Sequence, residues 1–187
     1  MKKNTIIMTT SAILLFLILL GPIMSNVEQP SYEVISSNSE IEIRKYEALI
    51  VAETQVQGSR ENSIKEGFRT IADYIFGNNQ NKQEIAMTAP VLQQQNASGW
   101  FVRFVLPAEF NLKSLPKPNK NLIRLREINQ KKYAVIKFSG SASKHNISTN
   151  QGKLDKYLSK NNITAVSTPT YAFYNPPWTL PFLRRNE

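Results

Sequence analysis

The amino-acid sequence predicts an α+β domain of mostly antiparallel strands with two helices lying across them. Runs such as "ALIVAE" (48–53) are rich in β-branched and aliphatic residues, which is typical of strands. Two stretches have apolar residues at helical spacing, one before Gly77 and one before Asn161. Several landmarks also recur at one offset along the chain. We therefore expect two equivalent halves that share one curled or barrel-like sheet.

The recurrence appears when the chain is shifted by 86 residues, the distance from Ala48 to Ala134. Each half then contains a strand, a helix and an apolar run that ends in proline, in the same order. The identity is sparse, so the prediction of a duplication depends on the shared order at a constant offset. The matched segments are 48–53 with 134–139, 68–75 with 154–161, and 85–90 with 171–176.

The first predicted helix has clear start and stop signals. Ser59 can act as the N-cap, and Gly77 can end the helix as a C′ glycine. The apolar positions between them, spaced as on one helical face, are Ile64, Phe68, Ile71 and Ile75.

For the second helix, the pattern "STNQ" at 148–151 predicts a capping box ahead of apolar Leu154 and Leu158. The Asn161–Asn162 pair predicts its end. This start places the only histidine, His145, in a polar loop before the helix.

A hairpin is predicted between the helices, with strands in 85–95 and 100–107 around "NASG". Pro90 should lie at an edge or a bulge because it has no N–H to donate. The proline-rich stretch 107–121 is the predicted connector between the halves.

Residues 1–26 differ from the rest of the chain. Two lysines precede the uncharged stretch 6–24, whose most apolar part is 12–20. This pattern is compatible with a cleaved signal peptide and with an uncleaved membrane anchor, and both readings stay open. Either reading predicts an exported protein, periplasmic, extracytoplasmic or anchored to the membrane, with one domain from about residue 30 to 187.

The chain carries a formal net charge of +9, and seven basic residues lie in 111–132. Aromatic residues are not interleaved with these charges, so we expect no nucleic-acid partner. A solvated loop and strand edge is the favoured interpretation of this basic connector, and contact with a membrane surface is the alternative.

Catalytic constellations are absent from the sequence. It has no cysteine, one histidine, and no zinc-protease, serine-hydrolase or nucleotide-binding motif. Apolar and aromatic residues with a few cations remain, and these are better suited to binding a flat, apolar, anionic molecule than to converting one. We therefore expect a protein that is not an enzyme.

Several motifs together resemble the SOUL family of haem-binding proteins. They are "YEVI" (32–35), "RKYEALIVAET" (44–54), "ADYIFGNN" (72–79), "IAMTAPV" (85–91) and "YNPPWTLPFLRRNE" (174–187). The resemblance implies a twisted antiparallel barrel of two βαββ-type halves with a helix on each, similar to gyrase-inhibitor-like domains. It also implies binding of haem or related tetrapyrroles beside the first helix.

On that helix, Phe68 and Ala72 stand four apart and would form an apolar floor. Lys65 and Arg69 border this floor and could meet the propionates. The full predicted haem-binding set is Ile64, Lys65, Phe68, Arg69, Ala72, Phe173 and Trp178. Haem is expected to bind without a histidine axial ligand, leaving tyrosine as the only plausible anionic ligand.

Other interpretations remain. Met87, Pro90, Pro176 and Trp178 can be core or edge residues with no ligand role. The whole protein can be a membrane-anchored interaction or small-ligand-binding protein without haem function. A hydrolase or isomerase acting on an amphipathic small molecule is the third reading.

Overall fold

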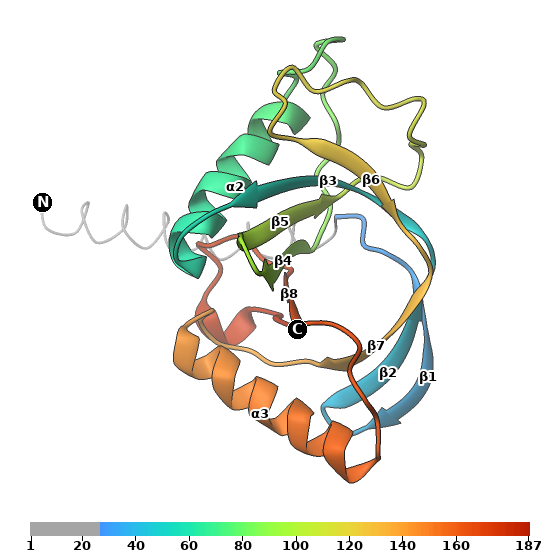
Figure 1. Ribbon diagram of the computed structural model, residues 1–187, viewed down its shortest axis with the longest axis vertical. Helices are drawn as coiled ribbons and strands as arrows, with labels where there is room; N and C mark the ends of the chain where they lie inside the picture. Colours follow the sequence, from blue (N-terminus) through green and yellow to red (C-terminus); the bar gives the residue numbers. More distant parts are fainter. Residues whose placement is uncertain (1–26) are drawn as a thin grey trace, which may run out of the picture.

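The computed structural model describes residues 27–187, which form an α+β fold with two helices and two sheets (Figure 1). The predictions made for residues 1–26 lie outside this range. The strands are β1 (Tyr32–Asn38), β2 (Ile41–Tyr46), β3 (Leu49–Val56), β4 (Val91–Asn96), β5 (Gly99–Val105), β6 (Arg124–Ile128), β7 (Lys131–Ile136) and β8 (Thr170–Phe173). The helices are α2 (Arg60–Ile75), α3 (Lys144–Lys160) and the short 3₁₀ helix η1 (Pro181–Leu183).

All strand pairs between these elements are antiparallel, as predicted. One sheet has the order β1-β2-β7 and the other the order β6-β3-β5-β4-β8. The curled single sheet or barrel is not what forms, because the described strands make two sheets that do not close. Strand β1 is exposed along its whole length and pairs only with β2, so it remains an edge.

The strand pairing supports the predicted duplication. The consecutive strands β2 and β3 of the first half pair crosswise with the consecutive strands β6 and β7 of the second half, β2 with β7 and β3 with β6. Exchanging the halves converts one of these pairs into the other, as a two-fold relation requires. Segments 48–53 and 134–139 accordingly contribute to corresponding strands, β3 and β7, each directly before a helix.

The third proposed match, 85–90 with 171–176, is wrong. Residues 171–173 belong to β8, whereas 85–90 are not in a strand. The backbone of 85–90 is held by other partners: the Ile85 amide donates to the Ile75 carbonyl, and the Ala89 amide to that of Glu28. Strand β4 starts only after Pro90, which cannot donate to a ladder.

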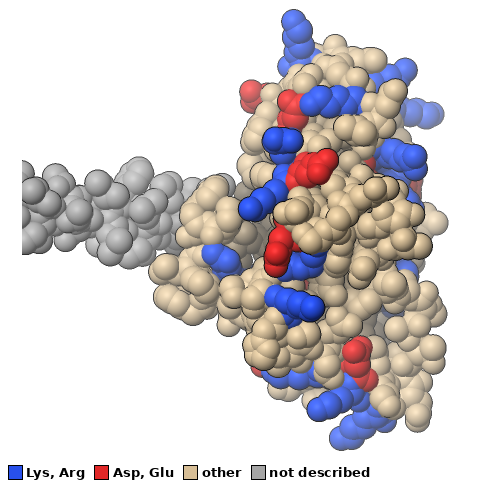
Figure 2. All heavy atoms as spheres, turned by 60° about the vertical axis from the view of Figure 1, so that its left-hand side comes forward, with Lys and Arg blue, Asp and Glu red and all other residues tan. Residues whose placement is uncertain are grey.

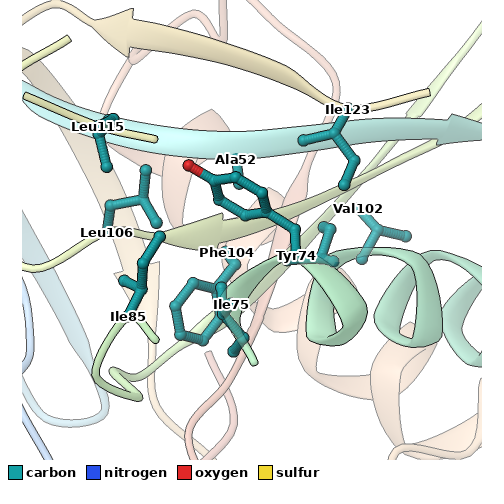
Figure 3. Packing of buried hydrophobic residues seen from close by; sticks show 10 residues of the cluster. Ala52, Tyr74, Ile75, Ile85, Val102, Phe104, Leu106, Leu115 and Ile123 are labelled. Atoms are coloured by element: carbon teal, nitrogen blue, oxygen red, sulfur yellow. The ribbon is translucent and has the colours of Figure 1, made fainter. Parts of the chain in front are cut away.

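Helix α2 begins and ends where predicted. The Ser59 side chain accepts from the Asn62 amide, and Gly77 follows the C-cap with a φ of +98°. The buried face is Ser63, Gly67, Ile71, Tyr74 and Ile75, and Figure 3 shows Tyr74 and Ile75 among the side chains of the sheet. Phe68, expected on the same face as Ile71, is instead 44% exposed. Gly67 explains this, because a Cβ there would lie 2.5 Å from a Val102 methyl, so the small side of the helix packs inward.

Helix α3 begins five residues before the predicted capping box. Its N-cap is Ser143 rather than Ser148, and the Ser143 hydroxyl accepts from the Asn146 amide. The Ser148 hydroxyl already donates to the His145 carbonyl inside the helix. His145 therefore lies in the exposed first turn of α3 and not in a loop, which corrects that prediction. The predicted end holds, with Asn161 as the C-cap.

On the face drawn in Figure 2, charges of both signs are mixed rather than gathered in one patch. Figure 2 shows acidic side chains among the lysines and arginines of the visible face. Most residues of the basic connector are exposed, as the solvated reading requires. Between residues 27 and 187, neither α2 nor α3 has the length and apolar character that crossing a bilayer would need.

Candidate ligand-binding cavity

A cavity of about 610 Å³ lies between the two halves, bounded by α3, by β2 and β7 of the small sheet, and by β4 and β8 of the large one. Residues 163–169, which connect α3 to β8, form a further wall. This volume is within the range of sites for small molecules and cofactors. Its apolar lining includes Ile43, Leu49, Leu92, Ile128, Val135, Ile136, Ile147, Leu154 and Leu158.

Helix α3 borders the cavity and is only sparsely buried against the strands. Only Ile147 and Asn150 of this helix are buried, although its apolar side chains point inward. Leu154 and Leu158 follow Ile147 by seven and eleven positions, so all three lie on one helical face. They line the cavity without filling it.

The aromatic part of the lining consists of Phe138 and four tyrosines, Tyr46, Tyr133, Tyr171 and Tyr174. Burial raises the pKa of each phenol, so all four are neutral at physiological pH. The rings of Tyr46 and Tyr133 meet edge to face, with centroids 5.7 Å apart. The Tyr171 hydroxyl donates to Gln151 Oε1 at 3.0 Å, which ties β8 to α3.

One end of the cavity is polar and internally paired. The Glu187 carboxylate accepts from the Tyr174 hydroxyl at 2.8 Å and from Arg44 Nη1 at 2.9 Å, and Arg185 Nη2 lies 2.7 Å from its other oxygen. Burial lowers the pKa of Arg44, but hydrogen bonds with Tyr46 and Glu42 outweigh it and raise the pKa. Because two guanidiniums compensate the negative charge of Glu187, its carboxylate serves as a structural part of the cavity wall and is not free to act as an acid or base.

The rim of the cavity carries charge of both signs. Lys131 and Lys132 lie at the start of β7, and the Lys131 ammonium is 5.6 Å from the centre of the Tyr133 ring. Glu47 and Asp155 are the acidic residues of the rim. The arrangement offers apolar walls for a flat body and two cations for an anionic edge.

The seven predicted haem-binding residues lie away from this lining. Ile64, Lys65, Phe68, Arg69 and Ala72 share the outward part of α2, as their spacing predicts. Phe173 belongs to β8, where its ring faces the Arg60 guanidinium at 5.9 Å. Trp178 is 58% exposed in the segment before η1. The first five are brought together, whereas Phe173 and Trp178 come from other elements.

Sequence reasoning missed the residues that do line the cavity. Signals were present: the apolar face of the second helix, and two lysines next to the strand run "YAVI" at 133–136. His145 does not line the cavity. Within residues 27–187, no group of three or more His, Cys, Asp or Glu side chains could hold a metal ion.

The fold is an α+β domain whose two halves are joined by crosswise strand pairing and enclose a cavity between them. The chain belongs to the SOUL heme-binding protein family, whose model matches residues 27–187. No curated protein matches the sequence significantly.

Solved structures show where the fold recurs. The C-terminal domain of EcmrR has a TM-score of 0.60 at 11% identity, over 83% of this chain and 93% of that chain. An uncharacterized conserved protein from Listeria innocua has a TM-score of 0.54 at 8% identity, over 81% and 91%. A hydrolase from the same organism has a TM-score of 0.51 at 7% identity, with the same coverage. At these identities the likeness shows the fold alone.

Proposed function

We propose that the protein binds haem or a related tetrapyrrole in the cavity beside α3, without catalysing a reaction. The observation that carries this is a cavity of about 610 Å³ with apolar and aromatic walls, in a chain of the SOUL family. A tetrapyrrole presents a flat apolar body and carboxylates at its edge. The walls suit the body, and Lys131 and Lys132 suit the carboxylates.

Iron ligation is not required for this binding. Of the side chains that usually bind haem iron, the lining offers only tyrosines, and burial raises the pKa of each phenol and disfavours the phenolate. Bound haem would supply a redox-active iron. The residues of this chain hold the ring and keep water from it. The metal-free ring should therefore bind nearly as tightly as haem.

The proposal of a non-catalytic role rests on the paired state of Glu187 and on the neutral phenols of the wall; the other carboxylates of the lining, Glu47 and Asp155, lie at the rim. A location in the cell envelope rests on the sequence of residues 1–26 alone. The outward face of α2 remains the alternative place for the ligand, with Phe68 as its floor and Lys65 and Arg69 beside it.

The test is a spectroscopic titration of the full chain with hemin and with protoporphyrin IX. Leu154→Trp should fill part of the cavity and lower the binding affinity for both ligands tenfold or more. The double variant Lys131→Ala, Lys132→Ala should lower the affinity for both ligands several-fold, with the largest effect at low salt. The matched controls are Lys65→Ala with Arg69→Ala on α2, and His145→Ala, both expected to leave binding unchanged.

If the α2 double variant weakens binding and Leu154→Trp does not, the ligand lies on α2. If the wild type binds neither ring, the proposed function is wrong.

A further inference from the structure

A short segment near the end of the chain exposes an unusual amount of apolar surface. In the loop 175–184, which contains η1, four large side chains within six positions are exposed: Trp178 at 58%, Leu180 at 45%, Phe182 at 70% and Leu183 at 60%. Scattered exposed apolar residues need no explanation, but a contiguous group indicates a contact surface.

The 175–184 loop is held in a fixed shape. Arg184 Nε donates to the Thr179 carbonyl at 2.7 Å, and the Leu183 amide donates to the Leu180 carbonyl at 2.9 Å. The Gly140 amide, before α3, donates to the Pro181 carbonyl at 2.8 Å. The loop is therefore a folded projection, whose backbone is held by these hydrogen bonds while its large apolar side chains are exposed.

Both ends of the loop contact the place where the described chain begins. Tyr174, just before the loop, packs in a small apolar cluster with Val27. Arg185, just after it, donates to Gln29 Oε1 at 3.0 Å. In the sequence, the uncharged stretch 6–24 ends three residues before Val27. Three residues span at most about 10 Å, so a bilayer holding that stretch would lie close to the loop.

The charge of the loop matches a negatively charged membrane surface. From Asn175 to Asn186 the sequence has two arginines and no Asp or Glu; Arg185 pairs with Glu187, so Arg184 is the cation that this loop offers to an anionic surface. Aromatic and leucine side chains flanked by arginine are the residues found where proteins enter the lipid interface.

We propose that the 175–184 loop inserts Trp178, Leu180, Phe182 and Leu183 into the surface of an anionic lipid bilayer. This surface is distinct from the basic connector 111–132, for which the sequence offered membrane contact as an alternative. It is also independent of what the cavity binds. The domain would then contact the membrane surface directly through this loop, in addition to any attachment through residues 1–26.

The two tryptophans of the chain make the test direct. Trp100 is 8% exposed and Trp178 is 58% exposed, so Trp100→Phe leaves Trp178 as the sole reporter. The full-length variant is reconstituted into phosphatidylcholine–phosphatidylglycerol vesicles with and without brominated acyl chains. We expect a blue shift and at least twofold quenching of Trp178 by the brominated lipid.

A matched control moves the reporter to another exposed aromatic position. Phe76, at the C-cap of α2, is 60% exposed, and the variant Trp100→Phe, Trp178→Phe, Phe76→Trp should show no quenching. Phe182→Glu with Leu183→Glu, in the Trp178 reporter, should remove the quenching while circular dichroism stays unchanged.

Unquenched Trp178 in vesicles that hold the protein would overturn the proposal, as would failure of the protein to associate with vesicles. A concentration-dependent dimer that shields Trp178 without lipid would also overturn it, because the loop would then bind a second copy.

Discussion

The two helices of the molecule occupy corresponding places in the two halves and do different things there. Helix α2 buries five residues and closes the main core against the large sheet. Helix α3 is one residue longer but buries only two, and the cavity lies beneath it. Gly67 lets α2 pack directly on Val102, whereas Leu154 and Leu158 of α3 face the cavity without filling it. In this duplicated fold, α2 therefore stabilises the domain by packing in the core, whereas α3 encloses a cavity.

The largest expected effect comes from shortening one apolar side chain on each helix to alanine. Ile71 on α2 is 3% exposed in the main core, so Ile71→Ala should lower the free energy of unfolding by about 2–5 kcal/mol. Leu154 on α3 already faces a cavity, and Leu154→Ala should cost much less, within about 1 kcal/mol. Urea unfolding of both variants measures this, and equal costs would mean that α3 packs as tightly as α2.

The second test uses pH. Burial raises the pKa of Tyr74 on α2 to about 12, against an unperturbed value of 10. A phenol whose pKa is raised by folding stabilises the protein fully below pH 10, and this contribution is lost as the pH rises to 12. At most about 2.7 kcal/mol should disappear over that window.

Tyr74→Phe supplies the control. It removes the hydrogen bond to the Pro116 carbonyl, so it is less stable than the wild type at neutral pH. The gap should narrow between pH 10 and 12 when unfolding is followed by circular dichroism. A constant gap would show that Tyr74 does not titrate in that window.

The third test compares two Gly→Ala substitutions that should change the free energy of unfolding in opposite directions. Gly67→Ala should destabilise by about 1–3 kcal/mol because the new methyl collides with Val102. Gly152→Ala should stabilise by up to about 1 kcal/mol, since alanine favours the helix and the space is open. Thermal unfolding measures both changes, and a Gly67→Ala variant as stable as the wild type would contradict the close packing of α2 on Val102.

The sequence predicted what local signals determine. Ser59 and Gly77 act within one helical turn, so the ends of α2 could be identified from their neighbours alone. The start of α3 was missed because Ser143 and Ser148 both offer a cap, and only the surrounding structure decides between them.

The cavity could not be predicted in the same way. It depends on a distance between α3 and strands that are remote in the sequence, and an apolar helical face has the same pattern whether it fills a core or lines a space. The outward turn of Phe68 was missed for a related reason: the fit of Gly67 against Val102 is not visible in helical spacing. The tyrosines of the lining come from three separate places in the chain, around residues 46, 133 and 171–174, and no local motif joins them.

The crosswise strand pairing also has a consequence for co-translational folding. Ile41 of β2 faces Ile136 of β7, 95 residues later in the chain. At typical synthesis rates, β2 waits for its partner for roughly 5–20 s with one edge unpaired, and such long-range pairing is intrinsically slow. Because β7 and α3 supply much of the cavity wall, the site can appear only after the second half has emerged. A nascent chain arrested before residue 131 should therefore have no cavity to offer a ligand.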